Sequence, residues 1–119
     1  MSKGQAEAAG KVEVLQGTLE LIVLQTLDGM GPQHGYGLAR RIEQVSGDLL
    51  RLNEGTVYAA LMRLQHRRLI SSSWGTSDAN RKAKFYAITT AGKRQLAREV
   101  AAWDQMTGLI ARLRGAEQD

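Results

Sequence analysis

The stretch from Leu52 to Leu69, LNEGTVYAALMRLQHRRL, constrains the fold of this chain more than any other segment. Asn53 is a favourable N-cap, because its side-chain oxygen can accept a hydrogen bond from a backbone N–H that the first helical turn leaves unpaired. Apolar residues then recur at the i, i+3, i+4, i+7 spacing of one helix face. They are Val57, Ala60, Leu61 and Leu64. The stretch therefore predicts a helix with one buried and one free face.

The free face of this predicted helix carries hydroxyl groups and cations. The residues on it or beside it are Thr56, Tyr58, Met62, Arg63, Gln65, His66 and Arg67. Such side chains can contact phosphates and base edges in the major groove of DNA, which is wide enough to admit one helix. The alternative is that the cations, with Arg68, only solvate a surface helix.

The positive charge of the chain is concentrated in this segment and the one that follows. The whole chain has a formal net charge of +4, whereas residues 51–84 hold seven cations and two anions, a net charge of +5. The remaining residues therefore carry a net charge of −1. A localised basic patch of this kind is typical of a protein that binds a polyanion.

Two apolar segments that precede the basic helix predict two further helices. Residues 19–27 are apolar on nearly all sides, which is typical either of a central core helix or of a helix that faces both the core and a second subunit. We expect Thr18 to cap this helix and a Gly-Pro turn at 31–32 to follow it. His34 is expected to hydrogen-bond at the start of the second helix. That helix is predicted to carry an apolar stripe and to end at Gly47. The stripe consists of Leu38, Ile42 and Val45, with Ala39 beside it.

After the third helix the apolar spacing changes from helical to alternating. Residues 70–75 and 83–89 predict two strands, with Tyr86 and Ile88 on one face and Phe85 on the other. The polar loop TSDANRK at 76–82 joins them. Three helices followed by a basic hairpin predict a winged helix-turn-helix, in which the wing can meet the DNA backbone or minor groove. The wing residues are Asn80, Arg81, Lys82 and Lys84. The alternative is a hairpin with a soluble, charged tip.

The last predicted helix begins at Thr90 and carries an apolar stripe whose members alternate by four and three residues. This is the seam of a coiled-coil-like contact. Its members are Leu96, Val100, Trp103, Thr107 and Ile110. Because the winged module has its own core, we expect the stripe to pack on a second copy of the chain. Trp103 is expected to be interface packing, or alternatively a platform for a ligand in a dimer cavity.

The predicted fold class is mainly α with a small β-hairpin, a winged helix-turn-helix followed by a C-terminal dimerisation helix. We divide the chain into a flexible arm (1–14), a DNA-binding domain (15–89), the dimerisation helix (90–114) and a tail (115–119).

Several function classes are disfavoured by the composition. The chain of 119 residues has no cysteine, which excludes disulfides, thiolate metal sites and cysteine nucleophiles. His34 and His66 have no partner carboxylate at a catalytic spacing, and no phosphate loop or zinc pattern occurs. We therefore expect neither an enzyme nor a metal or cofactor. No apolar run is long enough for a membrane span and no secretory signal is visible, so the expected location is the cytoplasm.

The motifs together resemble the PadR family of bacterial transcriptional regulators over roughly residues 15–113. The resemblance is carried by their order and spacing. The motifs are LQGTLELIVLQTL (15–27), HGYGLARRIE (34–43), NEGTVYAALMRLQHRRLI (53–70), SSWG (72–75), NRKAKFYAIT (80–89) and TAGKRQL (90–96). The single C-terminal helix resembles the smaller subfamily. One departure is Ala59, where the family usually has proline, and this puts the local rigidity of the helix in doubt.

The resemblance implies a homodimeric repressor that binds an inverted-repeat operator in double-stranded DNA. It implies DNA contacts by Tyr36, Thr56, Tyr58 and the basic wing, to which the helix face adds Arg63. It also implies that the C-terminal helix packs on the partner's first helix, which makes Leu19, Ile22 and Val23 dimerisation residues. Trp103 matches the position of a tryptophan that stacks flat aromatic ligands in drug-sensing members.

A winged helix that binds a protein partner, or an architectural module that binds DNA without sequence preference, is the alternative function. The salt dependence of binding distinguishes DNA binding from binding of a protein partner. The affinity for DNA falls steeply as the salt concentration rises, whereas the affinity across an apolar protein interface does not.

Overall fold

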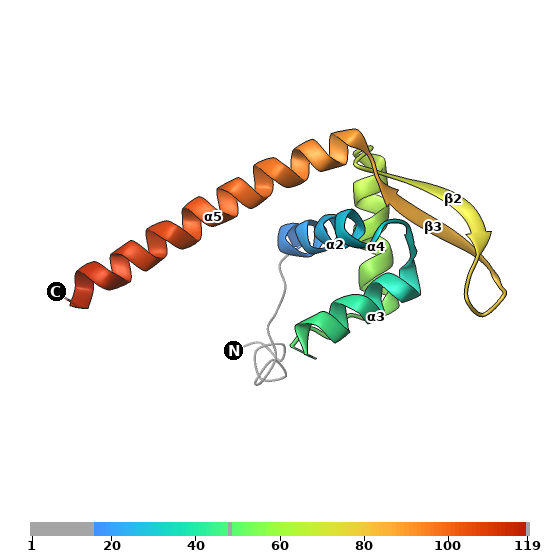
Figure 1. Cartoon of the computed structure of the whole chain (residues 1–119), viewed down its shortest axis with the longest axis horizontal. Helices are drawn as coiled ribbons and strands as arrows, with labels where there is room; N and C mark the ends of the chain where they lie inside the picture. Colours follow the sequence, from blue (N-terminus) through green and yellow to red (C-terminus); the bar gives the residue numbers. More distant parts are fainter. Residues whose placement is uncertain (1–15, 48, 119) are drawn as a thin grey trace.

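The computed structural model describes residues 16–47 and 49–118 (Figure 1). The elements are α2 (Gln16–Met30), β1 (Gln33–His34), α3 (Gly35–Ser46), α4 (Glu54–His66), β2 (Ile70–Thr76), β3 (Lys82–Ile88) and α5 (Thr90–Gln118). The mainly helical fold class with a small β-hairpin is confirmed. The arm expected at residues 1–14 lies outside the described residues.

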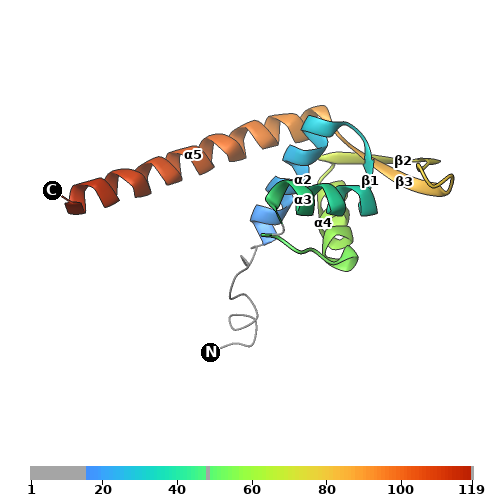
Figure 2. The same cartoon turned by 60° about the horizontal axis from the view of Figure 1, so that its bottom comes forward.

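The helices α2, α3 and α4 form a cluster from which α5 and the hairpin of β2 and β3 extend in opposite directions (Figures 1 and 2). The molecule is accordingly elongated, with a longest extent of 58 Å. Only the first part of α5 packs on the cluster, where Leu96 is buried and Val100 lies against the core. Beyond Val100 nearly every described residue of α5 is exposed in the single chain.

The core is made by the apolar stripes that the sequence predicts, with α2 in contact with α3, α4, α5 and β3. The residues with the least exposure are Val23, Leu24, Leu27, Leu38, Val57, Ala60, Leu61 and Leu64. The stripe predicted for the third helix is therefore confirmed in full. In the second helix, Leu38 and Ile42 are buried, but Val45 is 70% exposed and the prediction for it is wrong. Val45 instead lines an open groove between α2 and α3.

The sheet contains one strand that the sequence did not reveal. Its order is β1-β3-β2, and both pairs are antiparallel. Gln33 of β1 and Ser72 of β2 both pair with Tyr86 of β3, whose ring is buried. Two residues cannot show an alternating pattern, so β1 leaves no signal in the sequence.

Side-chain caps start α3 and α4 where the sequence predicts them. The His34 Nδ1 atom accepts a hydrogen bond from Gly37 N (3.0 Å), and Asn53 Oδ1 accepts one from Thr56 N (2.7 Å). Gly47 ends α3 with φ 61°, the left-handed conformation expected of a glycine there. Thr18 is not a cap, because α2 already includes Gln16.

The junction between α4 and α5 is a compact set of backbone contacts. Thr89, and not Thr90, caps α5, because its Oγ1 accepts a hydrogen bond from Gly92 N (3.0 Å) and donates one to Arg68 O (2.9 Å). Thr89 N also donates to Leu69 O (3.0 Å). Gly92 is buried directly against that carbonyl. The helix then continues to Gln118, so residues 115–118 belong to it and are not a tail.

Candidate nucleic-acid interface

Two tyrosines lie at the exposed start of the helix-turn-helix. Tyr36 is in the first turn of α3 and Tyr58 in the first half of α4, and both side chains are exposed. They line one cleft of about 390 Å³ together with Gly35, Glu54 and Gly55. The glycines keep the floor of this cleft open, so a phosphate could approach both phenol groups and the backbone at the start of α4. Thr56 is exposed beside them.

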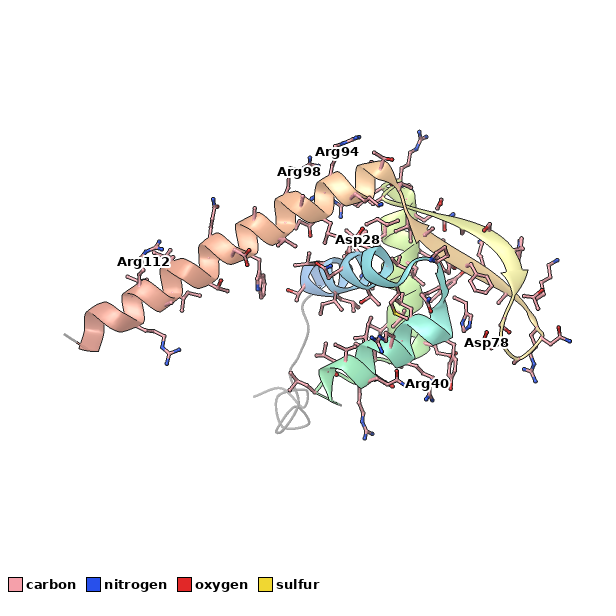
Figure 3. All side chains as sticks on the ribbon, viewed as in Figure 1. Asp28, Arg40, Asp78, Arg94, Arg98 and Arg112 are labelled. Carbon is pink, nitrogen blue, oxygen red and sulfur yellow. The ribbon has the colours of Figure 1, made fainter. Side chains whose placement is uncertain are left out.

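An arginine that the sequence analysis left out supports Tyr36. Arg40 lies one helical turn further along α3. Its Nη1 donates a hydrogen bond to Tyr36 Oη (3.4 Å), and its guanidinium lies 5.8 Å from the centre of the tyrosine ring. In Figure 3 its side chain points outward from α3. The i, i+4 spacing of Tyr36 and Arg40 is a signal that could have revealed this pair.

The wing faces α3 across a larger cleft of about 690 Å³. Arg40 and Arg41 line it from α3, and Arg81 and Lys82 line it from the wing. The tip also contributes Asp78, which Figure 3 shows on the loop beside α3. The cleft is therefore mainly basic, as expected of a surface that receives an anionic chain.

Hydrogen bonds within the loop hold the wing tip in shape. Ser77 N donates to Arg81 O (2.8 Å), and Asn80 N donates to Ser77 O (2.9 Å). Asn80 adopts φ 58°, a left-handed conformation that asparagine tolerates better than most residues. The exposed Asn80, Arg81 and Lys82 side chains are thus presented on an ordered turn, whereas Lys84 is half-buried further up β3.

Arg63 does not lie on the free face of α4, and the prediction that it does is wrong. Its Nε donates to Glu20 Oε2 of α2 at 2.9 Å, and Arg67 Nη1 donates to Glu20 Oε1 at 3.2 Å. The Glu20 side chain is 8% exposed, whereas those of Arg63 and Arg67 are 34% and 46% exposed. The two arginines therefore neutralise a buried carboxylate and fasten α4 to α2.

Replacing Glu20 with glutamine should lower the free energy of unfolding by about 1–2 kcal/mol, because the hydrogen bonds to a charged acceptor are lost. This loss of unfolding free energy is smaller than that expected for a fully buried ion pair, since both arginines can turn toward water. Urea unfolding of Glu20→Gln, Arg63→Gln and the double variant gives the coupling energy. Strictly additive effects would show that the ion pair contributes nothing.

Tyr58 also lies close to the sheet. Burial raises the pKa of the Tyr86 phenol above its ordinary value, and the charge of an ionised Tyr58 nearby raises that pKa further. Tyr86 is therefore a neutral phenol at physiological pH. Gln65 Nε2 of α4 donates a hydrogen bond to Ser72 Oγ, and Ser72 is the cross-strand partner of Tyr86, so α4 contacts the face of the sheet that carries Tyr86.

The far half of α5 carries an apolar stripe that is exposed in the single chain. Its large members are Trp103, Met106, Leu109, Ile110 and Leu113. Figure 3 shows Arg94, Arg98 and Arg112 on the outer side of the same helix, away from α2. Trp103 and Met106 line a cavity of about 450 Å³ with Gly17, Thr18 and Leu21 of α2. This amphipathic half-helix is a surface that a second chain could cover.

Three of the predicted dimerisation residues lie inside the chain's own core. Leu19, Val23 and Leu96 are almost completely buried without any partner. The expectation that they meet a second subunit directly is wrong, because all three are part of the core cluster of the single chain. Four others are left exposed or half-buried in the single chain. These are Ile22, Val100, Trp103 and Ile110. Thr107 is exposed as well, and its Oγ1 donates to Asp104 O at 3.1 Å.

The described residues, 16–47 and 49–118, contain neither a metal centre nor a membrane-spanning helix. Within these ranges, no three His, Asp or Glu side chains come close enough to hold a metal ion. No helix in the described part of the chain is long and apolar enough to cross a membrane.

Comparison with known proteins identifies the family of this sequence. Residues 23–98 match the family model described as the "Transcriptional regulator PadR-like family". Among curated proteins, the chain is 26% identical over 98 residues to an uncharacterized protein X of Lysinibacillus sphaericus, covering 82% of this chain and 89% of that one. It is 36% identical over 80 residues to a protein encoded in a transposon of Streptomyces fradiae, of whose length it spans only 21%.

Solved structures agree with that match. A PadR-like transcriptional regulator from Bacillus cereus superposes with a TM-score of 0.72 and 27% identity, over 83% of this chain and 93% of that one. A transcriptional regulator from Clostridium thermocellum has the same TM-score with 25% identity, over 82% and 93% of the two chains.

Proposed function

The chain belongs to the PadR-like family of transcriptional regulators, and from that premise we propose that it is a repressor that binds an inverted-repeat operator as a homodimer. As a member of this family it is a DNA-binding transcription regulator and not an enzyme. A dimer bound across a promoter excludes other proteins from the same DNA, which is the physical basis of repression. The observation that carries the proposal is that Tyr36 lines two clefts, one shared with Tyr58 at the exposed start of α4 and one shared with the basic wing.

In this proposal α4 enters the major groove, and the phenols of Tyr36 and Tyr58 donate to phosphate oxygens at its mouth. Thr56 reaches the DNA beside them. The wing follows the backbone toward the minor groove and supplies the salt-dependent part of the affinity. Its contact residues are Asn80, Arg81, Lys82 and Lys84. Arg63 is removed from the set, since Glu20 holds it.

The homodimer in this proposal is formed by the exposed half of α5. Its apolar stripe would cover an apolar groove of about 450 Å³ on the partner, between α2 and α3. The groove includes Ile22, Met30, Ile42, Val45 and Leu50. This arrangement accounts for the exposure of Val45, and it removes two apolar surfaces from water at once.

A flat aromatic molecule is the proposed effector. Trp103 and Met106 line a cavity beside α2 whose outer side the partner would close, and an indole is a favourable surface for stacking. Trp103→Ala should abolish ligand-dependent fluorescence quenching while the dimer stays intact. Dissociation of the dimer by the same change would make Trp103 a packing residue instead.

The experiment that tests the proposed function is a fluorescence anisotropy titration with the promoter DNA of the protein's own gene, repeated at several salt concentrations. We expect tight binding by a dimer that weakens with salt and is tighter than binding to random DNA. Equal affinity for all sequences would favour the architectural module. Failure to bind even at low salt would favour a winged helix that binds a protein.

Arg81→Ala should lower the magnitude of the slope of log K against log salt by about 1 per binding site, because one phosphate contact per wing is lost. The matched control is Arg98→Ala, which removes an exposed cation from the outer side of α5. The control should leave the slope unchanged. Equal effects of the two changes would mean that only the overall charge of the chain matters.

A further inference from the structure

Trp74 is a large aromatic residue on the wing that the contacts described above leave without a role. It lies in β2, where 64% of its surface is exposed. Its cross-strand partner is Lys84. The ammonium nitrogen of Lys82 lies 5.1 Å from the centre of its ring, and that of Lys84 lies 5.9 Å away. An exposed indole thus has two ammonium groups within 6 Å of its ring centre.

The strand register places Trp74 on the face of the sheet that α4 covers. Side chains alternate along a strand, so Ser72 and Trp74 share a face, and their partners Tyr86 and Lys84 lie on that same face. Gln65 Nε2 of α4 donates to Ser72 Oγ at 3.1 Å, and the Tyr86 ring is buried. Trp74 is therefore the next residue outward from the point where α4 contacts the sheet.

The surface around Trp74 is continuous with the proposed DNA interface. Gln65 of α4 contacts Ser72 beside Tyr86, and the row Tyr86, Lys84, Lys82 leads from there to the wing tip. A partner that touches Tyr58 and Arg81 together would pass over Trp74. That partner must be anionic, to pair with the two ammonium groups, and must also present an apolar surface to the indole.

We propose that Trp74, oriented by Lys82 and Lys84, contacts the sugar-phosphate backbone of duplex DNA beside the recognition helix. The proposal rests on the DNA-binding function proposed above. One face of the indole packs against deoxyribose, its Nε1–H donates to a phosphate oxygen, and the two lysines supply positive charge beside the ring. The cation–π contacts fix the ring before DNA arrives, so that less side-chain freedom is lost on binding.

Fluorescence distinguishes the two tryptophans of this chain. In Trp103→Phe the remaining emission comes from Trp74, and in Trp74→Phe it comes from Trp103. Saturating own-promoter duplex should change the emission of the Trp103→Phe protein and leave that of the Trp74→Phe protein nearly constant. No change of Trp74 emission in a protein that demonstrably binds the duplex would overturn the inference.

Affinity measurements supply the second test. Trp74→Ala should weaken duplex binding about five- to ten-fold with an unchanged salt slope, because the indole carries no charge. Lys84→Ala should instead reduce the slope by about 1 per binding site. The control is Ser73→Ala, which alters an exposed residue on the opposite face of β2. Circular dichroism checks that each variant is folded.

The outcomes separate this inference from the function on which it rests. Wild-type protein that fails to bind any duplex, even at low salt, would overturn both. Wild-type binding with normal salt dependence, together with wild-type affinity of Trp74→Ala, would overturn the role of Trp74 alone. Loss of a protein partner by Trp74→Ala, with DNA binding unchanged, would assign the surface to protein recognition instead.

Discussion

Gly92→Ala should lower the free energy of unfolding by about 3 kcal/mol, at the upper end of the usual cost of overpacking. A Cβ atom at this position would lie 2.1 Å from Leu69 O and 2.7 Å from Ile88 Cγ1. The first of these atoms belongs to the backbone and accepts the hydrogen bond from Thr89 N. It cannot move without opening the junction that joins the end of α4 to the start of α5.

Gly108→Ala is the matched control for this prediction. It lies in the same helix, and its added methyl group would meet only Arg112 Nη1 at an ordinary 3.5 Å. Since alanine is the better helix former, the control should stabilise the protein by up to about 1 kcal/mol. Urea unfolding measures the free energy of unfolding of both variants. It is done at one fixed protein concentration, since a dimer's stability depends on concentration. A stable Gly92→Ala protein would mean that the junction adapts easily.

Ile110→Lys should convert the dimer into a monomer and weaken operator binding by about 100-fold or more, because the second half-site is then no longer bound intramolecularly. Ile110 is exposed in the single chain, at the middle of the apolar stripe of α5. A lysine there would put a charge into the proposed contact with the partner. The fold of one subunit should survive, since Ile110 makes no part of its core.

The control for this prediction is Ala101→Lys, nine residues earlier on the same helix and half a turn out of phase with Ile110. Ala101 is exposed on the side of the helix opposite the stripe. Sedimentation and the operator titration should find this variant unchanged. A dimeric Ile110→Lys protein with full affinity would place the dimer interface elsewhere on the chain.

The local structure of this protein could be predicted closely from its sequence. The spacing of Val57, Ala60, Leu61 and Leu64 gave the buried face of α4 correctly, and Asn53 marked its start. Both hairpin strands were predicted to within one residue at each end. These features depend on residues a few positions apart, so a short window of sequence contains all that determines them.

The candidate site could be predicted only in part. The sequence identified Tyr36, Tyr58 and the wing as exposed and polar, and the structure brings them to neighbouring clefts. It did not identify Arg40, whose role depends on a contact with Tyr36, or Trp74, whose role depends on the strand register. Residue type alone does not say which face of a sheet a side chain occupies.

By itself the sequence determined the order of the helices and hairpin strands, the caps of α3 and α4 and most of the apolar faces, because periodicity and capping are properties of neighbouring residues. Only the tertiary structure decided which charges are free. Glu20 lies 43 residues from Arg63 and 47 from Arg67, and no local pattern foretells that they pair. It also decided that Leu19, Val23 and Leu96 complete the core of the single chain, which leaves the apolar stripe on the far half of α5 exposed. An apolar face must be buried, but only the packing of the whole chain selects what covers it.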